Sequence, residues 1–333
     1  MELVEVTAAE YNKGNRAVLV YDSEPFLELN KEKVQAVHYY IFRDKKDRFR
    51  LALGERVDKG LYGPYSAPFG LMEDVQRHWT LEQLDEAVAC LDAHAKKEGH
   101  SNVRFILPPA FYYPKMVTGM MGSLLRNAYQ VSWQDMNYAL PLRKLYVPSY
   151  GSMLRPNARK NLRIALNSGL ALVYCSNEAE CKEAYDVIAV NRKEKGYPLR
   201  MTWEQVRSTI AFMPHDFFLV QKDGVSVASA VVFHPAESIA QVIYWGNILE
   251  YAYLKPINFL SYQLIQYYGN KGFDYLDIGP SSEEGVPNYG LCDFKESIGC
   301  ELTAKFILEK SYCGESNITR QKMSHTSVSG GWD

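Results

Sequence analysis

The sequence contains no run of about 20 consecutive apolar residues, which is the length that a membrane-spanning helix requires. Its N-terminal segment also lacks the basic stretch, apolar stretch and small-residue cleavage site of a secretory signal. We therefore expect a cytoplasmic protein with no integral membrane association.

Cysteine is scarce and irregularly placed. The six cysteines form no CxxC pair, and the seven histidines form no HExxH motif. Scattered thiols are typical of a reducing compartment, and this spacing predicts no metal site. GxSxG, GxGxxG and Walker A motifs are also missing, which argues against the commonest hydrolase, dinucleotide and P-loop sites.

The sequence also has no large excess of positive or of negative charge. Lysine and arginine number 37 against 39 acidic residues, so no overall field attracts nucleic acid, and any basic site must be local. The 333 residues are 47% hydrophobic, which is enough for two domains with sizeable cores. The 24 tyrosines suit a long polar groove, because their rings pack at one end and are solvated at the other.

The chain repeats one order of elements: hairpin, helix, strand, helix, strand. In the first half we expect them at 34–42 with 48–53, 80–98, 102–108, 115–126 and 129–142, with a loop at 61–70. Next we expect a basic helix (157–168), a strand (170–175), a helix (178–195) and a further helix that begins with a Thr202–Gln205 capping box. The second set follows at the Asp223-Gly224 hairpin and at 238–248, 256–270, 273–279, 291–298 and 301–310.

This order predicts a mixed α/β protein with two similarly built domains, 1–147 and 148–310, which meet at a cleft. Residues 311–333 are rich in Ser, Gly, Thr and Asn, so we expect a flexible tail there.

Several segments match a known pattern. A basic helix is indicated by PNARKNLRIALNSGL (156–170). Residues 244–280 indicate a strand, a loop, a helix and a second strand. A Phe-Lys element with a Gly-containing turn follows at LCDFKESIGCEL (291–302). LPPAFYY (107–113) and MNYALPL (136–142) fit strands of the first half. In this order and spacing they resemble the FemABX-like transferases, which have two tandem GNAT-type acyltransferase domains.

The resemblance implies direct transfer of an acyl or aminoacyl group to a primary amine of a small molecule or peptide. Relatives use aminoacyl-tRNA, and other GNAT enzymes, including acetyltransferases, use acetyl-CoA or another thioester. Acetyl-CoA-dependent domains hold the pyrophosphate with a glycine-rich turn, but the junction at 251–258 has no glycine. The donor, acyl-CoA or aminoacyl-tRNA, therefore stays open. Lys255 could hold a phosphate by charge, and Asn258 lies at the same junction.

A local basic stripe is expected on the helix at 157–168. Arg155, Arg159 and Arg163 stand four apart and therefore share one face. Guanidinium groups bind phosphate in a bidentate fork, which fits tRNA or a nucleotide-linked substrate. The alternative is a solvated face of an amphipathic helix.

Two residues are candidates for catalysis. Lys295 could neutralise charge that develops on the carbonyl oxygen during attack, and the alternative is an exposed helix lysine. Asp277 ends a predicted strand and could accept the amine proton, but an Asp before Gly and Pro also forms Asx turns.

Aromatic residues are candidates for binding the acceptor. Tyr244, Tyr253 and Tyr289 could line the groove, although packing explains any one of them equally well. Trp245 lies where the strands are expected to separate, and backbone N–H groups there could face the acyl oxygen. The rival class is a noncatalytic binding protein that keeps the groove without the chemistry.

Overall fold

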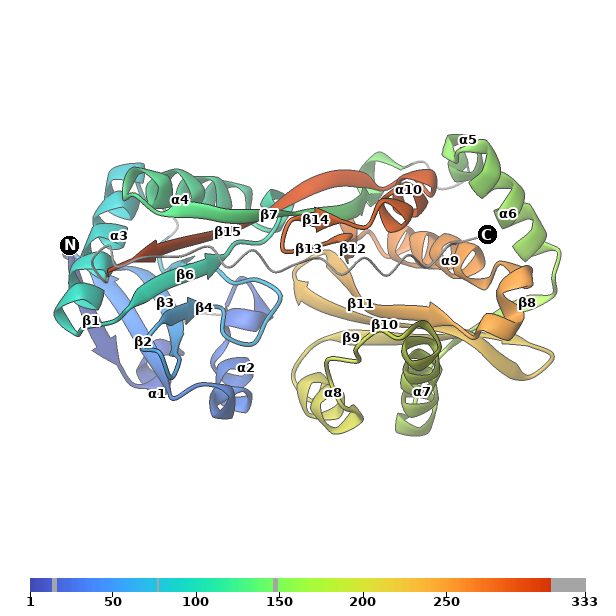
Figure 1. Cartoon of the computed structure of the whole chain (residues 1–333), viewed down its shortest axis with the longest axis horizontal. Coiled ribbons are helices and arrows are strands. Elements are labelled where there is room, and N and C mark those ends of the chain that lie inside the picture. Colours follow the sequence, from blue (N-terminus) through green and yellow to red (C-terminus); the bar gives the residue numbers. More distant parts are fainter. Residues whose placement is uncertain (14–16, 77, 146–148, 313–333) are drawn as a thin grey trace, which may run out of the picture.

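In the part of the chain that the structure describes, 13 strands form one sheet, in the order β1-β2-β3-β4-β6-β15-β7-β12-β11-β10-β9-β8, with β5 paired to β3. The computed structural model describes residues 1–13, 17–76, 78–145 and 149–312. Figure 1 shows the first half of the chain on the left, the second half on the right, and the long strands β7 and β15 running between them. The predicted mixed α/β class is confirmed.

The described residues of the first half form seven strands and the helices around them. The strands are β1 (Glu2–Val6), β2 (Ala36–Arg43), β3 (Asp47–Glu55), β4 (Leu61–Gly63), β5 (Glu73–Asp74), β6 (Asn102–Ile106) and β7 (Gln130–Pro141). The helices are α1 (Ala8–Tyr11), α2 (Glu24–Leu29), α3 (Leu81–Lys97) and α4 (Pro114–Arg126), with the 3-10 turns η1 (Val20–Asp22), η2 (Lys31–Lys33) and η3 (Ala110–Tyr112). The short strand β4 lies inside the segment predicted as a loop.

The second half follows after η4 (Leu142–Lys144). Its helices are α5 (Tyr150–Met153), α6 (Pro156–Leu166), α7 (Glu178–Lys195), α8 (Trp203–Ile210), α9 (Pro256–Asn270) and α10 (Tyr289–Ser297), with η6 (Leu249–Leu254) before α9. Its strands are β8 (Leu170–Tyr174), β9 (His215–Lys222), β10 (Val225–Ala236), β11 (Ile239–Asn247), β12 (Tyr275–Pro280), β13 (Ser282–Glu283), β14 (Val286–Pro287) and β15 (Glu301–Ser311).

The two halves are built alike. Antiparallel strands lead in each half to one parallel pair, β4 with β6 and β11 with β12. Each parallel pair is only three residues long. The repeated element order predicted from the sequence is therefore confirmed.

The last strand of each half completes the sheet of the other. β15 pairs with β6 from Ile307 to Ser311, and the end of β7 pairs with β12 from Asn137 to Pro141. β7 and β15 also pair with each other along most of their length. The division at residue 147 stays a prediction, but the sheet itself is continuous across it.

Local signals explain why the helices and hairpins begin where they do. Thr80 with Gln83 and Thr202 with Gln205 form reciprocal capping boxes at the starts of α3 and α8. Asp223 and Gly224 both take positive φ angles, 51° and 82°, as the tight turn between β9 and β10 requires.

The end of the described chain is anchored. Ser311 is the last residue of β15, and the Tyr312 hydroxyl donates to Asp92 over 2.6 Å. The rest of the predicted tail, 313–333, lies outside the described residues. The helices of the described segments are all too short or too polar to cross a bilayer.

Candidate active site

The parallel strands β11 and β12 separate soon after they meet. They pair only from Ile239 to Gln241 on β11. β11 then continues along β10 to Asn247, while β12 stays paired with β7, its partner on the other side, as far as Pro280. Within the described segments, no strand pairs with this outer edge of β11 beyond Gln241. An extended ligand could therefore hydrogen-bond to that edge as an added strand would.

A bulge in β11 lies at the point of separation. Val231 of β10 faces Tyr244, whereas the next residue, Val232, faces Val242, so Ile243 is an extra residue in β11. A bulge of this kind re-aims the backbone and side chains on either side of it, and such bulges occur often beside active sites. At this point, therefore, the separation of β11 from β12 coincides with backbone groups of β11 that leave the regular hydrogen-bonding pattern of the sheet.

The start of α9 follows β11 through η6. Lys255, at its N-cap, takes the left-handed conformation with φ 57° and ψ 45°, and Pro256 occupies the first helical position. Tyr253 is 67% exposed just before this turn, whereas Asn258 is buried in the first turn of the helix. The predicted residues Tyr253, Lys255 and Asn258 thus share one junction, where a cation, an exposed ring and a helix N-terminus meet.

Lys295 is buried under the end of β12. Its ammonium donates to the carbonyl oxygens of Ile278 (3.1 Å), Gly279 (2.8 Å) and Pro280 (3.0 Å). The three contacts use all three N–H groups of the side chain. Burial lowers the pKa of Lys295 to about 8. Beyond Asp277, β12 no longer pairs with β11, and the Lys295 ammonium supplies hydrogen bonds to the carbonyls at this end of β12. Lys295 is therefore not the exposed helix lysine that was the alternative expected from the sequence.

Asp277 is fully buried in β12. One carboxylate oxygen accepts from the Asn137 amide (2.8 Å) and the Gly279 N–H (2.9 Å). The other accepts from the Tyr112 hydroxyl (2.7 Å) and the Gln241 amide (3.3 Å). Burial raises the pKa of Asp277, while its hydrogen-bond donors oppose that shift by favouring the ionised form. In this conformation the carboxylate has no free surface for a substrate amine, and its catalytic role stays a prediction.

The same buried network joins the two halves. Tyr112 and Asn137 belong to the first half, and Gln241 and Asp277 to the second. The Tyr21 hydroxyl extends the network by donating to Gln241 over 2.7 Å. Polar groups buried in this way hold neighbouring elements in one arrangement when every partner is satisfied. The network therefore fixes the seam, that is, the contact between the two halves, next to the residues at which β11 and β12 separate.

Most of the predicted basic stripe is occupied within the chain. Arg155 pairs with Asp293 (2.5 Å) and Glu296 (2.6 Å) of α10. Arg159 donates to three carbonyl oxygens around the end of α5, at distances of 2.8 to 3.1 Å. Arg163 is exposed in the last turn of α6. A phosphate-binding role for the stripe stays a prediction. Within the described residues, Arg163 differs from the other two in that its side chain makes no hydrogen bond or ion pair.

The predicted aromatic residues lie in different environments. Tyr244 is buried, with the Arg192 guanidinium 5.7 Å from its ring centre, and burial raises the pKa of its hydroxyl. Trp245 packs edge-on against Phe294, the residue before Lys295, with ring centres 6.2 Å apart. Tyr289 is 79% exposed at the start of α10. Trp245 therefore connects β11 to the Lys295 helix, whereas Tyr244 faces the α7 side.

Comparison with solved structures identifies this arrangement. The chain superposes on the crystal structure of FemX with a TM-score of 0.68 at 13% identity, covering 94% of this chain and 98% of FemX. It also superposes on the C-terminal domain of a putative lysylphosphatidylglycerol synthetase from Agrobacterium fabrum (TM-score 0.59, 10% identity, 92% and 93% covered). A third match is L-PGS from Bacillus licheniformis (TM-score 0.56, 12% identity, 90% of each chain). The chain has a FemABX-like fold. No protein-family model and no curated protein sequence matches it.

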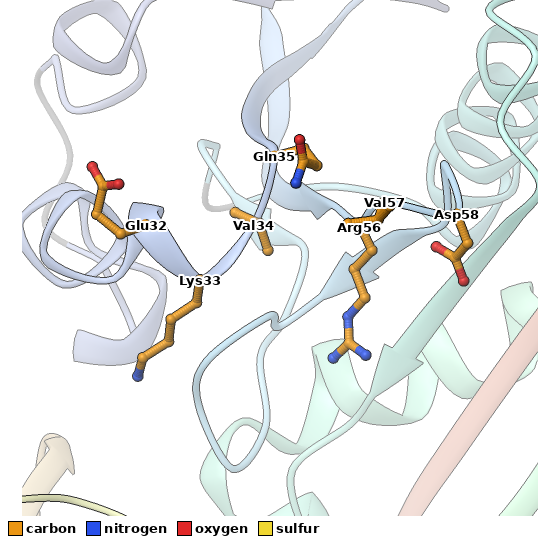
Figure 2. A pocket seen from close by; sticks show the side chains of 7 residues that line it. All are labelled: Glu32, Lys33, Val34, Gln35, Arg56, Val57 and Asp58. Carbon is orange, nitrogen blue, oxygen red and sulfur yellow. The ribbon is translucent and has the colours of Figure 1, made fainter.

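Two hollows lie elsewhere on this FemABX-like fold. One is in the first half and is lined by Glu32, Lys33, Val34, Gln35, Arg56, Val57 and Asp58 (Figure 2). Figure 2 shows Lys33 and Arg56 extending in the same direction, while Glu32 points away from them. The other lies beside β8 and α8, and Asp216, Arg207 and Cys181 are among its lining residues. Neither hollow is lined by a residue that the sequence predicted for the site.

Sequence reasoning missed the partners of Asp277. Gln241 and Asp277 are each a polar residue among apolar neighbours in their strands, and Asn137 lies in the buried second half of β7 in the FemABX-like sheet. Gln241 and Asp277 are direct register partners, and all three side chains are buried. Isolated polar residues at buried strand positions require partners, so this pattern could have indicated that the three strands are neighbours.

Proposed function

We propose that the protein transfers an acyl or aminoacyl group from an activated ester or thioester to a primary amine, by direct attack and without a covalent enzyme intermediate. The separation of β11 and β12 next to the start of α9 is the observation that carries this proposal. The whole-length likeness to FemX and to the lysylphosphatidylglycerol synthetase domain supports it at the level of fold.

The chemistry needs few protein groups. The amine nitrogen attacks the acyl carbon, the bond from that carbon to the leaving oxygen or sulfur breaks, and the leaving atom takes up the amine proton. Holding both reactants in register supplies much of the rate, and backbone N–H groups near the β11 bulge would stabilise the oxyanion. In this proposal Lys295 acts by holding the end of β12 away from β11, which keeps the acyl position open. Asp277 fixes the last register pair of the two strands through its contact with Gln241.

Two donor classes fit the site. Lys255 beside the exposed Tyr253 suits a phosphate near the start of α9, and Arg163 suits a more extended anion such as tRNA. The junction lacks the glycines that let backbone approach a pyrophosphate closely, so we favour an aminoacyl-tRNA donor over acetyl-CoA. We further propose that the reaction takes place in the cytoplasm, where aminoacyl-tRNA is made.

The test offers the purified chain radiolabelled aminoacyl-tRNAs and, separately, acyl-CoA thioesters, each with a panel of small and peptide amines. We expect labelled amide product from aminoacyl-tRNA. Lys255→Ala should lower kcat/KM by roughly 10-fold or more, as loss of a charge-assisted contact does. Lys271→Ala, at the opposite end of α9, is the matched control and should change it little. Silence with both donors, together with amine binding to the intact protein, would support a noncatalytic binding protein instead.

A further inference from the structure

Two histidines and a glutamate converge on the first half of the sheet, remote in sequence from the residues discussed so far. His38 lies on β2, Glu55 ends β3, and His100 follows α3 after Gly99, which turns the chain with a φ of 76°. One nitrogen or oxygen from each side chain lies within 4.8 Å of the others. We propose that His38, Glu55 and His100 form a binding site for a divalent transition-metal ion of the zinc type.

The donor atoms already lie near the spacing that such an ion requires. His38 Nε2 is 3.1 Å from Glu55 Oε2, and His100 Nδ1 is 3.8 Å from the same oxygen. Zn²⁺ binds nitrogen and oxygen at about 2.0–2.2 Å in a tetrahedron, which puts neighbouring ligand atoms roughly 3.3–3.5 Å apart. Small side-chain movements would therefore bring all three atoms onto one ion, and water would complete the coordination.

The other ring nitrogen of His38 has the partner that metal-binding histidines usually have. His38 Nδ1 is 2.7 Å from the carboxylate of Glu5 on β1. A carboxylate in this position fixes the ring and makes the opposite nitrogen a better ligand. Because a carboxylate only accepts, Glu5 holds the proton on Nδ1, and the Nε2 atom that faces Glu55 is the one available to a metal.

A buried polar group next to the cluster supports the assignment independently. Tyr40 is fully buried and stacks on the His38 ring, and its hydroxyl has no hydrogen-bond partner within the described segments. The Tyr40 hydroxyl would donate to water on the metal, which would satisfy an otherwise unpartnered group.

His100 changes tautomer when the site fills. Its Nδ1 donates to the Lys59 carbonyl over 3.2 Å, so the proton moves to Nε2 when Nδ1 binds the ion.

The test uses the full chain after treatment with a chelator and dialysis. Titration with ZnCl₂ by calorimetry should show one ion per chain. His38→Gln and His100→Gln should abolish this binding, and Glu5→Gln should weaken it roughly 10–100-fold. His78→Gln removes an exposed histidine outside the cluster and should leave binding unchanged.

Visible absorption of Co²⁺ in place of Zn²⁺ reports coordination directly, so it separates loss of the site from loss of the fold. Circular dichroism of each variant checks that it is folded. Absence of stoichiometric binding by the intact protein would overturn the proposal, as would binding that survives both histidine substitutions. None of these readouts depends on transferase activity.

Discussion

Tyr112 of the first half donates its hydroxyl to the carboxylate of Asp277 in the second half over 2.7 Å, and both groups are buried. The contact crosses the seam next to the place where β11 and β12 separate. A mutation there should affect the stability of the whole sheet, because each half completes the strands of the other.

Replacing Tyr112 with Phe removes one of the four donors to Asp277. We expect the free energy of unfolding to fall by about 1–3 kcal/mol, since the buried carboxylate is left undersatisfied. Urea unfolding followed by circular dichroism measures the change. Tyr289→Phe, at an exposed position, should stay within roughly 0.5 kcal/mol of the unmodified protein. Equal stability of the two variants would show that the seam contact contributes nothing.

Asp277→Asn separates a positioning role from a catalytic one. The new amide brings N–H groups where donors already converge, so we expect a clear loss of stability. The activity of the folded fraction should stay within about 10-fold of the original, because protein groups already occupy both carboxylate oxygens. A general base would instead account for roughly 10²–10⁴ in rate. A loss of that size, in protein shown to be folded, would support Asp277 as the proton acceptor.

Lys295 makes stability depend on pH in a particular direction. Burial lowers its pKa from 10.5 to about 8, so between these values the unfolded chain binds more protons than the folded one. Stability contributed by this group therefore rises with pH from about 8 to 10.5, and the full cost of burying the charge is present below pH 8. The total change is on the order of 3 kcal/mol.

The measurement is the difference in unfolding free energy between the unmodified protein and Lys295→Met across this pH range. Tyrosine and cysteine titrations are common to both proteins and cancel to first order in the difference. We expect the difference to move in favour of the unmodified protein as pH rises. A flat difference would mean that Lys295 keeps its ordinary pKa.

Of the two arginines in α6, we expect Arg159 to contribute to stability and Arg163 to contribute to tRNA binding. Arg159→Ala removes three contacts to backbone carbonyls and should cost about 1–2 kcal/mol of stability. Arg163→Ala should leave stability unchanged and weaken tRNA binding, with a smaller dependence of affinity on salt. Filter binding at several salt concentrations tests the second variant. If Arg163→Ala binds tRNA as well as the unmodified protein at every salt concentration, the stripe is only a solvated face.

Local signals in the sequence predicted the elements well. The Thr80–Gln83 capping box predicted the start of α3 because both partners lie within one turn, and the Asp223-Gly224 pair predicted its hairpin for a similar reason. The environments of Lys295 and Asp277 could not be predicted in this way. Their partners come from distant segments, and a lysine saturated by three carbonyls has the same sequence signature as an exposed one.

The predicted arginine stripe shows the same limit. Arg159 and Arg163 were correctly placed on a helix and Arg155 is its N-cap, but the contacts of the stripe depend on α5 and α10, which only the fold brings next to it. Likewise, spacing gave no indication that His38 and His100 meet, because three strands and the whole of α3 lie between them in the sequence.

The position of β15 has a consequence for how the protein forms during synthesis. This strand fits between β6 and β7, which are made much earlier in the chain. Until β15 has been made, β6 and β7 each expose an unpaired edge that invites pairing with another chain. The first half of the sheet therefore stays incomplete until a segment more than 150 residues downstream of β7 has been synthesised.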